Sequence, residues 1–425
     1  MIFIANTLAF NGGTTFLVRI LKEYFDSGKK CAVLVLTKNI DVNLEKQIEK
    51  VADIFYLYDF VKFPFQKIAN NQLSIYLPLQ KKSLKSLFHD YGNQAHIMGI
   101  FGMLFILRLL SNKIQIDYSI GVYHQNEFMY ECKNDKYFSN IIKKVFSSIN
   151  PSKILFFNET NLKDYMQFFK CDLTHAKITP IGINKIENIN LSSFNSKRIV
   201  SIGNLSPFKT YNKHMINVIY NLKNKYPNMD IKYDIYGDGD MKYELNTLIN
   251  NLKLNKQVKL HGRIEYAKMQ DVLKDTFLFI GSGTAILESA SYQIPSIVGI
   301  QSIKEPITYG FISDIDGLSY NEYVKTLKTD TIESFVEKIL LNHDKYQDAS
   351  SRCYEKSLEF TIDKTKLAFD ELFEIKERSK KVNYSNILGL FNFIYLGVLD
   401  KLNISKCFSQ RRDQSNVLNE KKTYE

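Results

Sequence analysis

The chain has 425 residues, which is enough for two domains of ordinary size whose cores need no disulfide or metal. Hydrophobic residues make up 45% of it and charged residues 24%, a balance that excludes a disordered chain and a membrane protein with many spanning helices. The 56 lysines and arginines exceed the 45 acidic residues by 11, and this surplus favours anionic partners: a nucleotide, a membrane surface or a nucleic acid.

The spacing of cysteines and histidines and the length of the apolar segments restrict the remaining classes of protein. The five cysteines are odd in number and far apart, so we expect the protein to occur in the reducing cytoplasm. No histidine pair has metal-ligand spacing, so we expect no metal site. Residues 1–10 lack a basic segment and are typical of a first strand rather than a signal peptide. The longest apolar run, Ile97 to Leu110, is shorter than the ~20 residues that span a bilayer, and we expect a buried helix there.

The first half alternates short β-branched runs with longer amphipathic stretches, which is the pattern of βα units around a parallel sheet. A polar stretch, 186–197, follows the turn at Pro180 to Asn184 and is predicted to be an interdomain linker. The strands expected before it cover residues 2–5, 30–37, 54–57, 115–123 and 153–157.

The second half repeats this rhythm, with strands expected at 198–203, 232–237, 258–262, 277–281 and 296–299. Glycines stand at the carboxyl ends of these strands, where open α/β sheets bind ligands. The sequence therefore predicts the α/β class, with two Rossmann-like doubly wound domains whose carboxyl edges face a central cleft. The expected parts are a first domain at 1–185, the linker, a second domain at 198–345, C-terminal helices at 346–377 that pack back on the first domain, and a basic tail at 378–425.

The loop from Gly203 to Tyr211 is the first candidate binding segment. A strand ends at Gly203 and a helix begins near Tyr211, so backbone N–H groups of the turn and the helix N-terminus suit phosphate oxygens. Lys209 adds a positive charge at the same place. A plain βα turn with a solvated lysine has the same pattern, and spacing alone leaves both interpretations open.

The segment from Gly281 to Glu288 is the second candidate. Its glycines allow close approach to the backbone, while Ser282 and Thr284 are able to cap a helix or donate to phosphate. Glu288 lies one turn after Thr284 on the same helix face, where a carboxylate suits ribose hydroxyls. A first-turn glutamate favoured by the helix dipole is the equally good alternative.

Three further segments gave weaker signals. His124 ends a strand of the first half and suits a sugar hydroxyl, although such a histidine is more often structural. Gly12-Gly13 forms a turn that fits neither phosphate-binding fingerprint. Asp238-Gly239-Asp240 is favoured as a turn with a helix N-cap over a metal site.

Together these segments resemble a glycosyltransferase of family 4, with the two-domain GT-B fold. Gly203-Asn204-Leu205 with Lys209 keeps the spacing of the family's Gly-Arg-Leu-x-x-x-Lys-Gly segment, which binds the donor pyrophosphate, although Asn204 replaces the arginine. Gly237-Asp238-Gly239 matches its Gly-Asp-Gly turn, and Leu260-His261-Gly262 its strand before the base pocket, which implies Arg263 and Ile264 beside the base.

The resemblance extends to the other candidates. Of the family's two glutamates, the second matches Glu288, which would bind the donor ribose, and the first would fall at Ile280 and is absent. Gly12-Gly13 matches the glycine turn near the diphosphate, and His124 matches the cleft histidine. The variant loop at Gly281 to Thr284 resembles a subgroup that makes bacterial surface polysaccharides such as capsule, O-antigen or lipopolysaccharide.

The resemblance implies a retaining transferase that moves a sugar from a UDP- or GDP-sugar donor to a glycan or lipid-linked acceptor, without cofactor or metal. Lys209, His124 and Glu288 are the expected catalytic residues. The donor would also contact the set Gly12, Gly13, Gly203, Asn204, Gly237, Arg263, Ile264, Ser282, Gly283, Thr284 and Leu287. A sugar-nucleotide epimerase and an inactive donor-binding relative remain alternatives, and no nucleic-acid recognition module is present.

Two segments are candidates for contact with the anionic inner face of the cytoplasmic membrane. Gln80 to Phe88 is a short basic and apolar stretch, and Ile387 to Leu399 is an apolar stretch with lysines around it. An ordinary surface helix followed by a disordered tail is the alternative for the second segment.

Overall fold

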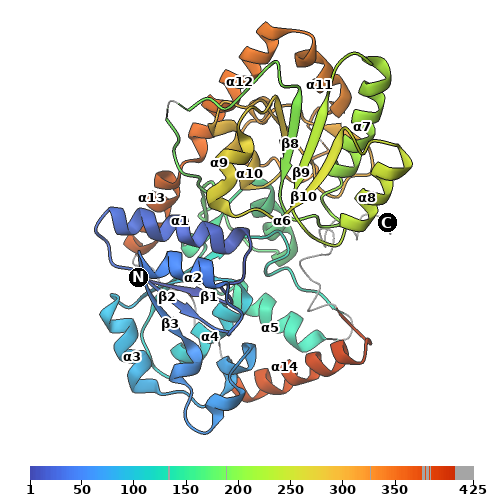
Figure 1. The fold of residues 1–425 in the computed structure, drawn as a ribbon. Helices are drawn as coiled ribbons and strands as arrows, with labels where there is room; N and C mark the ends of the chain where they lie inside the picture. Colours follow the sequence, from blue (N-terminus) through green and yellow to red (C-terminus); the bar gives the residue numbers. More distant parts are fainter. Residues whose placement is uncertain are drawn as a thin grey trace. The chain divides into compact units, whose positions relative to one another are not determined.

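The computed structural model describes residues 1–132, 135–187, 189–325, 327–375, 379, 382 and 384–406. The chain forms two compact units: unit 1 is made of Met1–Pro180 and Ile362–Glu425, and unit 2 of Ile181–Thr361. Each unit is built around its own parallel sheet (Figure 1). Of the predicted basic tail, 378–425, the part from residue 407 on lies outside the described residues.

Unit 1 contains a seven-stranded parallel sheet in the order β3-β2-β1-β4-β5-β6-β7. Because all strands run in the same direction, their carboxyl ends meet at one edge. The strands are β1 (Ile2–Ala5), β2 (Ala32–Val35), β3 (Asp53–Tyr56), β4 (Gln94–Met98), β5 (Asp117–Val122), β6 (Ile154–Phe156) and β7 (Lys177–Ile178).

Helices from both ends of the chain cover this sheet. The helix α13 packs against α1 and β5, and the buried Lys153 Nζ donates to the Leu372 carbonyl of α13 at 2.7 Å. The helices of unit 1 are α1 (Gly12–Asp26), α2 (Val42–Glu49), α3 (Lys81–Asp90), α4 (Ile100–Ser111), α5 (Lys136–Phe146), α6 (Glu159–Phe169), α13 (Ile362–Glu374) and α14 (Asn386–Lys401).

Unit 2 contains a five-stranded parallel sheet in the order β10-β9-β8-β11-β12 and a separate antiparallel pair, β13 (Ile307–Thr308) and β14 (Asp330–Thr331). Its parallel strands are β8 (Arg198–Ile202), β9 (Lys232–Tyr236), β10 (Val258–Gly262), β11 (Leu278–Gly281) and β12 (Ser296–Val298). Its helices are α7 (Tyr211–Lys225), α8 (Lys242–Asn251), α9 (Met269–Leu273), α10 (Thr284–Ser291), α11 (Ile332–Leu340) and α12 (His343–Ser357).

The structure differs from the sequence expectations at three places. The apolar run from Ile97 to Leu110 joins the end of β4 to α4, and Gly99, with φ 104°, separates the two elements. The expected linker at 186–197 is part of unit 2, where the Leu191 N–H donates to the Tyr292 carbonyl at 3.0 Å. Residues 346–361 also belong to unit 2, because α12 packs on α10 and α11.

Candidate functional site

The carboxyl end of β8 places an ammonium group directly over the backbone. A Cβ added at Gly203 would lie 2.8 Å from Lys209 Nζ, so the lysine side chain folds back over the strand end. Lys209 is half-buried, and it forms no ion pair in the described part of the chain. A partly desolvated cation without a carboxylate partner is suited to an anionic ligand.

The start of α7 adds hydrogen-bond donors next to this ammonium. Thr210 is the N-cap of α7, and its buried hydroxyl has no hydrogen-bond partner among the described residues. The Asn212 side chain fixes the first turn, because its Oδ1 accepts hydrogen bonds from Ser201 Oγ at 2.9 Å and Tyr233 Oη at 2.8 Å. The first N–H groups of a helix lack intrahelical acceptors and favour a negative charge. Lys209, Thr210 and this helix start therefore form one arrangement that is suited to an anion, and we call it the anion-binding arrangement.

Two glycines let the loops after β8 and β9 pack in direct contact. A Cβ at Gly237 would lie 1.9 Å from the Gly203 carbonyl oxygen, and one at Gly239 would lie 2.6 Å from the Leu205 carbonyl oxygen. Hydrogen bonds join the same loops, from the Leu205 N–H to the Asp238 carbonyl at 3.0 Å and from the Met241 N–H to the Leu205 carbonyl at 3.0 Å. The predicted Gly237 thus holds the Lys209 loop in place, whether or not it also contacts a ligand.

The β11–α10 loop lies beside this arrangement in the sheet. β8 and β11 are neighbouring parallel strands that pair with Leu278 opposite Ile199, so Gly203, directly after β8, and Ser282, directly after β11, emerge from adjacent strands at the same edge of the sheet. Ser282 Oγ is buried and accepts from Gln301 Nε2 at 3.3 Å. The N-terminus of α10 therefore begins about one strand spacing from the strand end beneath Lys209.

Gly283 is the N-cap of α10 and has φ +66°, a conformation that favours glycine. Its N–H donates to Asn321 Oδ1 at 2.6 Å, and its carbonyl accepts from Tyr320 Oη at 3.0 Å. In this structure the predicted Gly283 N–H already has an acceptor. Thr284 and Ala285 are the first residues of α10, so their N–H groups lack intrahelical acceptors.

Glu288 lies one turn into α10 and is 7% exposed. Tyr266 Oη donates to Glu288 Oε1 at 3.0 Å, which orients the carboxylate. Burial, followed by the nearby Glu288 charge, raises the pKa of Tyr292. A buried, oriented carboxylate on the helix that starts beside the anion-binding arrangement is suited to paired hydroxyl groups.

The remaining predicted residues of unit 2 differ in accessibility. Asn204 and Arg263 are exposed and Ile264 is half-buried, all in loops at the carboxyl edge. The Leu287 side chain is fully buried in the hydrophobic core, so only the backbone of this residue is left for the predicted donor contact, which stays a prediction. Ile280 is likewise fully buried inside β11, and residues 281–284 are the ones that emerge at the strand end.

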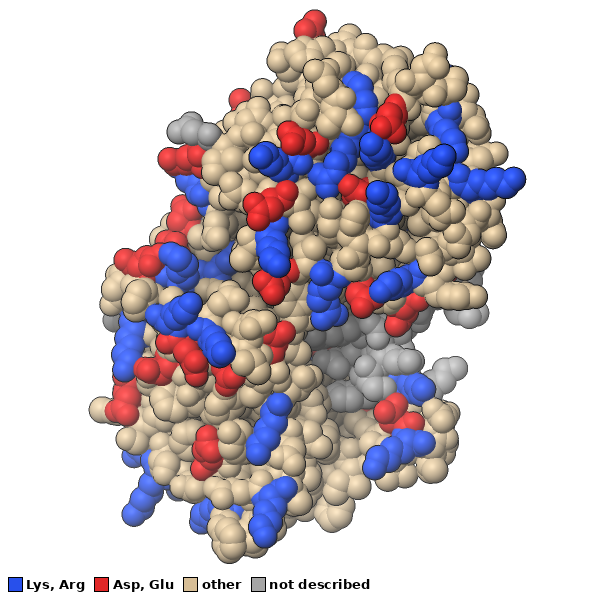
Figure 2. Space-filling view, in the orientation of Figure 1, with Lys and Arg blue, Asp and Glu red and all other residues tan. Residues whose placement is uncertain are grey.

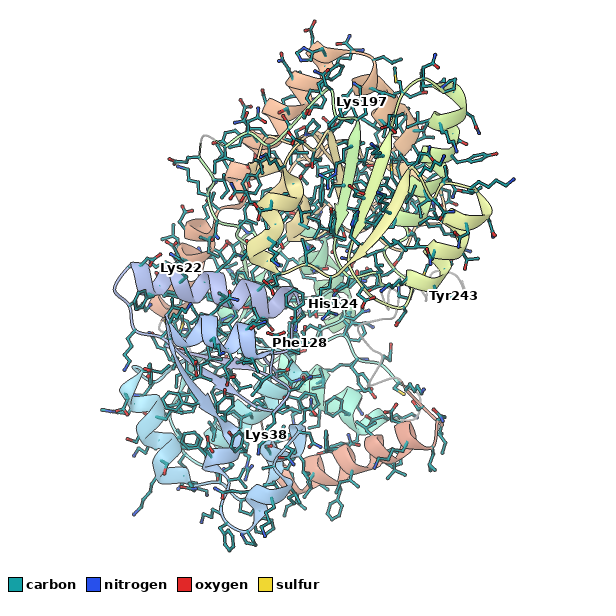
Figure 3. All side chains as sticks on the ribbon, in the orientation of Figure 1. Lys22, Lys38, His124, Phe128, Lys197 and Tyr243 are labelled. Atoms are coloured by element: carbon teal, nitrogen blue, oxygen red, sulfur yellow. The ribbon has the colours of Figure 1, made fainter. Side chains whose placement is uncertain are left out.

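Unit 1 presents neutral donors at its own carboxyl edge. Gly12 and Gly13 are the first residues of α1, and the N-cap Asn11 Oδ1 accepts from the Thr14 N–H at 3.1 Å. His124 lies on the loop after β5, and its Nδ1 accepts from the Asn126 N–H at 3.2 Å (Figure 3). In its neutral form, an imidazole that accepts at Nδ1 carries its hydrogen on Nε2, which makes that atom a donor.

Sequence reasoning missed several polar side chains that shape the site. Thr210, Tyr266, Gln301 and Asn321 lie next to predicted residues in space, but only Thr210 is also next to one in sequence. The three others come from separate loops, and no short motif contains them. A Thr directly before a predicted helix start is an N-cap signal that would have identified Thr210.

The charged side chains and the possible metal ligands of the described residues are spread over the molecule. Figure 2 shows basic and acidic side chains intermingled over this face of both units, so the basic residues do not gather in one stripe there. Within the described residues, no group of three or more His, Cys, Asp or Glu side chains is arranged to hold a metal ion. Asp238, one of the paired carboxylates noted in the sequence, forms an ion pair with Lys242 at 3.3 Å.

Comparison with known proteins assigns part of the chain. Residues 183–308 match the protein family described as Glycosyl transferases group 1. A search of curated proteins found no match.

Solved structures of the GT-B fold are similar over most of the chain. A TarM mutant from S. aureus, in complex with fondaparinux, alpha-GlcNAc-glycerol and UDP, has a TM-score of 0.64 at 13% identity, covering 88% of this chain and 99% of TarM. HepE from Anabaena, in complex with UDP and glucose, has a TM-score of 0.61 at 13% identity, covering 88% and 98%. The lipopolysaccharide outer core galactosyltransferase WaaB has a TM-score of 0.53 at 11% identity, covering 88% and 98%. The expected fold, two Rossmann-like parallel-sheet domains of the GT-B type, is confirmed.

Proposed function

We propose, from the match of residues 183–308 to the Glycosyl transferases group 1 family, that this protein is a glycosyltransferase with a nucleotide-sugar donor and a glycan acceptor. The observation that carries this proposal is the arrangement at the carboxyl edge of unit 2. There the Lys209 ammonium, the unpartnered Thr210 hydroxyl and the starts of two helices lie within neighbouring loops of one sheet. Such a site has the donors for a diphosphate and, in Glu288, an acceptor for ribose hydroxyls.

The donor diphosphate would be the leaving group, and its negative charge grows as the bond to the sugar breaks. Lys209 and the first N–H groups of α7 and α10 would stabilise that charge, which is often the largest single contribution to catalysis. These groups are held by the sheet and by the contact between the Gly203 and Gly237 loops, so they need little reorganisation during the reaction. No metal is required for this step, because the protein groups supply the positive charge.

The acceptor would be bound by unit 1, where His124 offers an Nε2–H to a sugar hydroxyl. We propose retention of the anomeric configuration by attack from the same face as the leaving group, within an ion pair of sugar cation and diphosphate. The departing phosphate oxygen would take the proton of the attacking hydroxyl. This route needs no protein nucleophile.

The pathway is the most specific part of the proposal. We propose a role in the synthesis of bacterial surface polysaccharide with a lipid-linked acceptor at the inner face of the cytoplasmic membrane. WaaB, which is similar in fold, is described as a lipopolysaccharide outer core galactosyltransferase, and HepE was solved with UDP and glucose. UDP- and GDP-sugars are accordingly the first donors to test.

A panel of sugar nucleotides tests the proposal. We expect one UDP- or GDP-sugar to raise the melting temperature, since a ligand at 100 times its Kd stabilises the folded state by about 2.7 kcal/mol. Adding a glycan acceptor should then release the nucleoside diphosphate and extend the glycan. If the protein instead converts the sugar nucleotide alone into its epimer, the transferase assignment is wrong. If no sugar nucleotide changes the melting temperature, the donor site itself is wrong.

A further inference from the structure

The outward face of α14 is apolar, which is the reverse of an ordinary surface helix. Its six large exposed residues are between 47% and 66% exposed, and at about 100° per residue they fall within a sector about 120° wide. We call this sector the apolar stripe; it consists of Ile387, Leu388, Phe391, Ile394, Tyr395 and Val398. No charged residue occurs between Asn386 and Leu399.

The opposite face of α14 is packed on unit 1, so the helix is a fixed part of that unit. Leu396 and Leu399 are buried in its hydrophobic core, and the ring of Phe393 lies 5.6 Å from that of Tyr76. Asn386 Nδ2 donates to the Tyr76 carbonyl at 3.1 Å. The apolar stripe is therefore presented outward by a docked helix, and fraying does not explain its exposure.

A second exposed apolar segment lies at the same end of unit 1. Phe63, Phe65 and Ile68 are 79%, 41% and 52% exposed, and they precede the 3₁₀ helix η3 (Gln72–Tyr76) that contacts α14. Figure 1 shows this part of the chain and α14 together at one end of the unit. The two segments contain nine of the 19 exposed large hydrophobic side chains of the described chain.

Basic residues border both segments. Lys62 and Lys67 flank the phenylalanines, Lys401 ends α14, and Lys406 follows it, all of them exposed. Residues 60–70 contain no acidic side chain. An apolar surface bordered by lysines fits the interface of an anionic bilayer, where apolar side chains enter the acyl region and ammonium groups meet lipid phosphates.

We propose that α14 and residues 62–68 together form a docking surface for an anionic membrane, with α14 lying parallel to the bilayer plane. α14 is 16 residues, about 24 Å long, shorter than the ~30 Å hydrocarbon core. No helix in the described part of the chain is long and apolar enough to cross a membrane. A symmetric contact with a second copy is the competing occupant, and the oligomeric state measured below distinguishes it from the membrane.

The structure also corrects the other membrane candidate from the sequence. In α3, Leu84, Leu87 and Phe88 are buried in the core of unit 1, so the apolar side of the 80–88 segment is not available to lipid. Lys81, Lys82 and Lys85 on α3 are exposed, so that segment offers only positive charge.

Vesicle sedimentation of the full-length protein tests the docking surface without donor or acceptor. We expect binding to vesicles of phosphatidylcholine with phosphatidylglycerol, weaker binding to phosphatidylcholine alone, and weakening by salt. Phe391→Asp combined with Ile394→Asp should reduce binding at least ~10-fold, since each removes a large apolar side chain from the interface. Phe63→Asp should reduce it by a smaller factor. The matched control is Leu367→Asp, which changes a 61% exposed leucine of α13 and should bind as the native chain does.

Several outcomes would overturn the proposal. These are absence of native binding to the anionic vesicles, native-like binding of the Phe391→Asp, Ile394→Asp variant, or loss of binding on removal of residues 407–425 alone. A native dimer that the double variant converts to a monomer would assign the surface to a second copy instead. Circular dichroism of each variant checks folding. Because sugar-nucleotide binding and transfer are measured separately in solution, failure here leaves the proposed transferase activity untouched and bears only on the proposed membrane location.

Discussion

Units 1 and 2 share a parallel-sheet architecture, but their carboxyl edges differ in charge. In unit 2 an ammonium group without an ion-pair partner in the described chain lies over the end of β8, next to an unpartnered hydroxyl. In unit 1 the corresponding edge presents the α1 start at Gly12 and a neutral imidazole at His124. The first edge suits an anion and the second suits neutral hydroxyl groups.

This difference shows how one architecture is adapted to two kinds of ligand. The sheets fix where the loops emerge, and only the loop residues decide the chemistry. A charged leaving group needs fixed positive charge, whereas a neutral glycan needs directional hydrogen bonds. Three measurements test whether the two edges divide these tasks, and a fourth compares the cores of the two units.

Removal of the ammonium should have the largest effect. We expect Lys209→Ala to lower turnover ~10²-fold, the usual cost of losing one group that stabilises transition-state charge. The control is Lys213→Ala, because Lys213 lies in the first turn of α7, is exposed and pairs with Glu244 at 2.7 Å. Steady-state kinetics with saturating donor measures the effect, and near-native turnover of the Lys209 variant would remove this residue from the mechanism.

The carboxylate of Glu288 comes next. Glu288→Gln should weaken donor binding on the order of 10-fold to 100-fold, the range for a hydrogen bond to a charged group. Calorimetric titration with the donor is the measurement, and Glu244→Gln, an exposed glutamate of unit 2, is the control. Equal donor affinity of the Glu288 variant and the native chain would contradict the ribose contact.

His124 should have a smaller effect, confined to the acceptor. We expect His124→Ala to raise the acceptor KM roughly fivefold through loss of one neutral hydrogen bond, with donor affinity unchanged. His89→Ala serves as the control, because His89 is exposed at the end of α3. A loss of donor affinity in the His124 variant would show that the two edges do not divide the ligands as inferred.

The last prediction concerns stability below neutral pH, to which we expect the cores of the two units to respond differently. His96 in unit 1 is fully buried between Ser119 Oγ and Tyr123 Oη, each 2.8 Å from a ring nitrogen, and burial lowers its pKa to about 3. Between pH 6.5 and a pH of about 3, this histidine binds a proton in the unfolded chain but not in the folded chain. Unit 1 should therefore lose stability as pH falls below 6.5, by about 1.4 kcal/mol per pH unit.

Unit 2 should respond only at lower pH. Burial raises the pKa of Asp234, but hydrogen bonds from His261 at 2.8 Å and Arg198 at 2.6 Å outweigh it and hold the pKa below 3.8. The stability due to this lowered pKa is present above pH 3.8 and is lost as pH falls through the folded value. Hydrogen exchange measured by mass spectrometry at pH 7 and at pH 5.5 should show that the lower pH weakens the protection against global exchange more in unit 1 than in unit 2. His96→Gln should remove part of that difference, and an identical pH response of both units would contradict the assignment.

Much of the fold was predictable because parallel strands that are buried on both faces appear as short apolar runs. The strands at Ile2–Ala5 and Arg198–Ile202 were located almost to the residue. β4 was not found, because its buried residues run directly into the apolar helix α4 and leave no change of period to detect. Only the backbone turn at Gly99 separates them.

The candidate site was predictable where its residues are neighbours in sequence. Lys209 and Gly203 were found together because one short loop contains both, and Glu288 because it lies one turn from Thr284. Asn321 and Tyr266 were missed because their contacts with Gly283 and Glu288 join segments distant in sequence. The apolar segment from Ile387 to Leu399 was singled out in the sequence, but hydropathy does not tell which of its side chains pack on the protein and which face outward.

The contact between the Gly203 and Gly237 loops has a consequence for engineering donor preference. The Gly203 carbonyl occupies the space that a Cβ at Gly237 would need. A change of the backbone path in either loop therefore requires a matching change in the other. Grafting a foreign 203–210 segment would create a steric conflict with residues 237–241 unless both segments came from the same parent. Libraries that vary these two stretches as one cassette should therefore yield more folded transferases with altered specificity than libraries that vary either stretch alone.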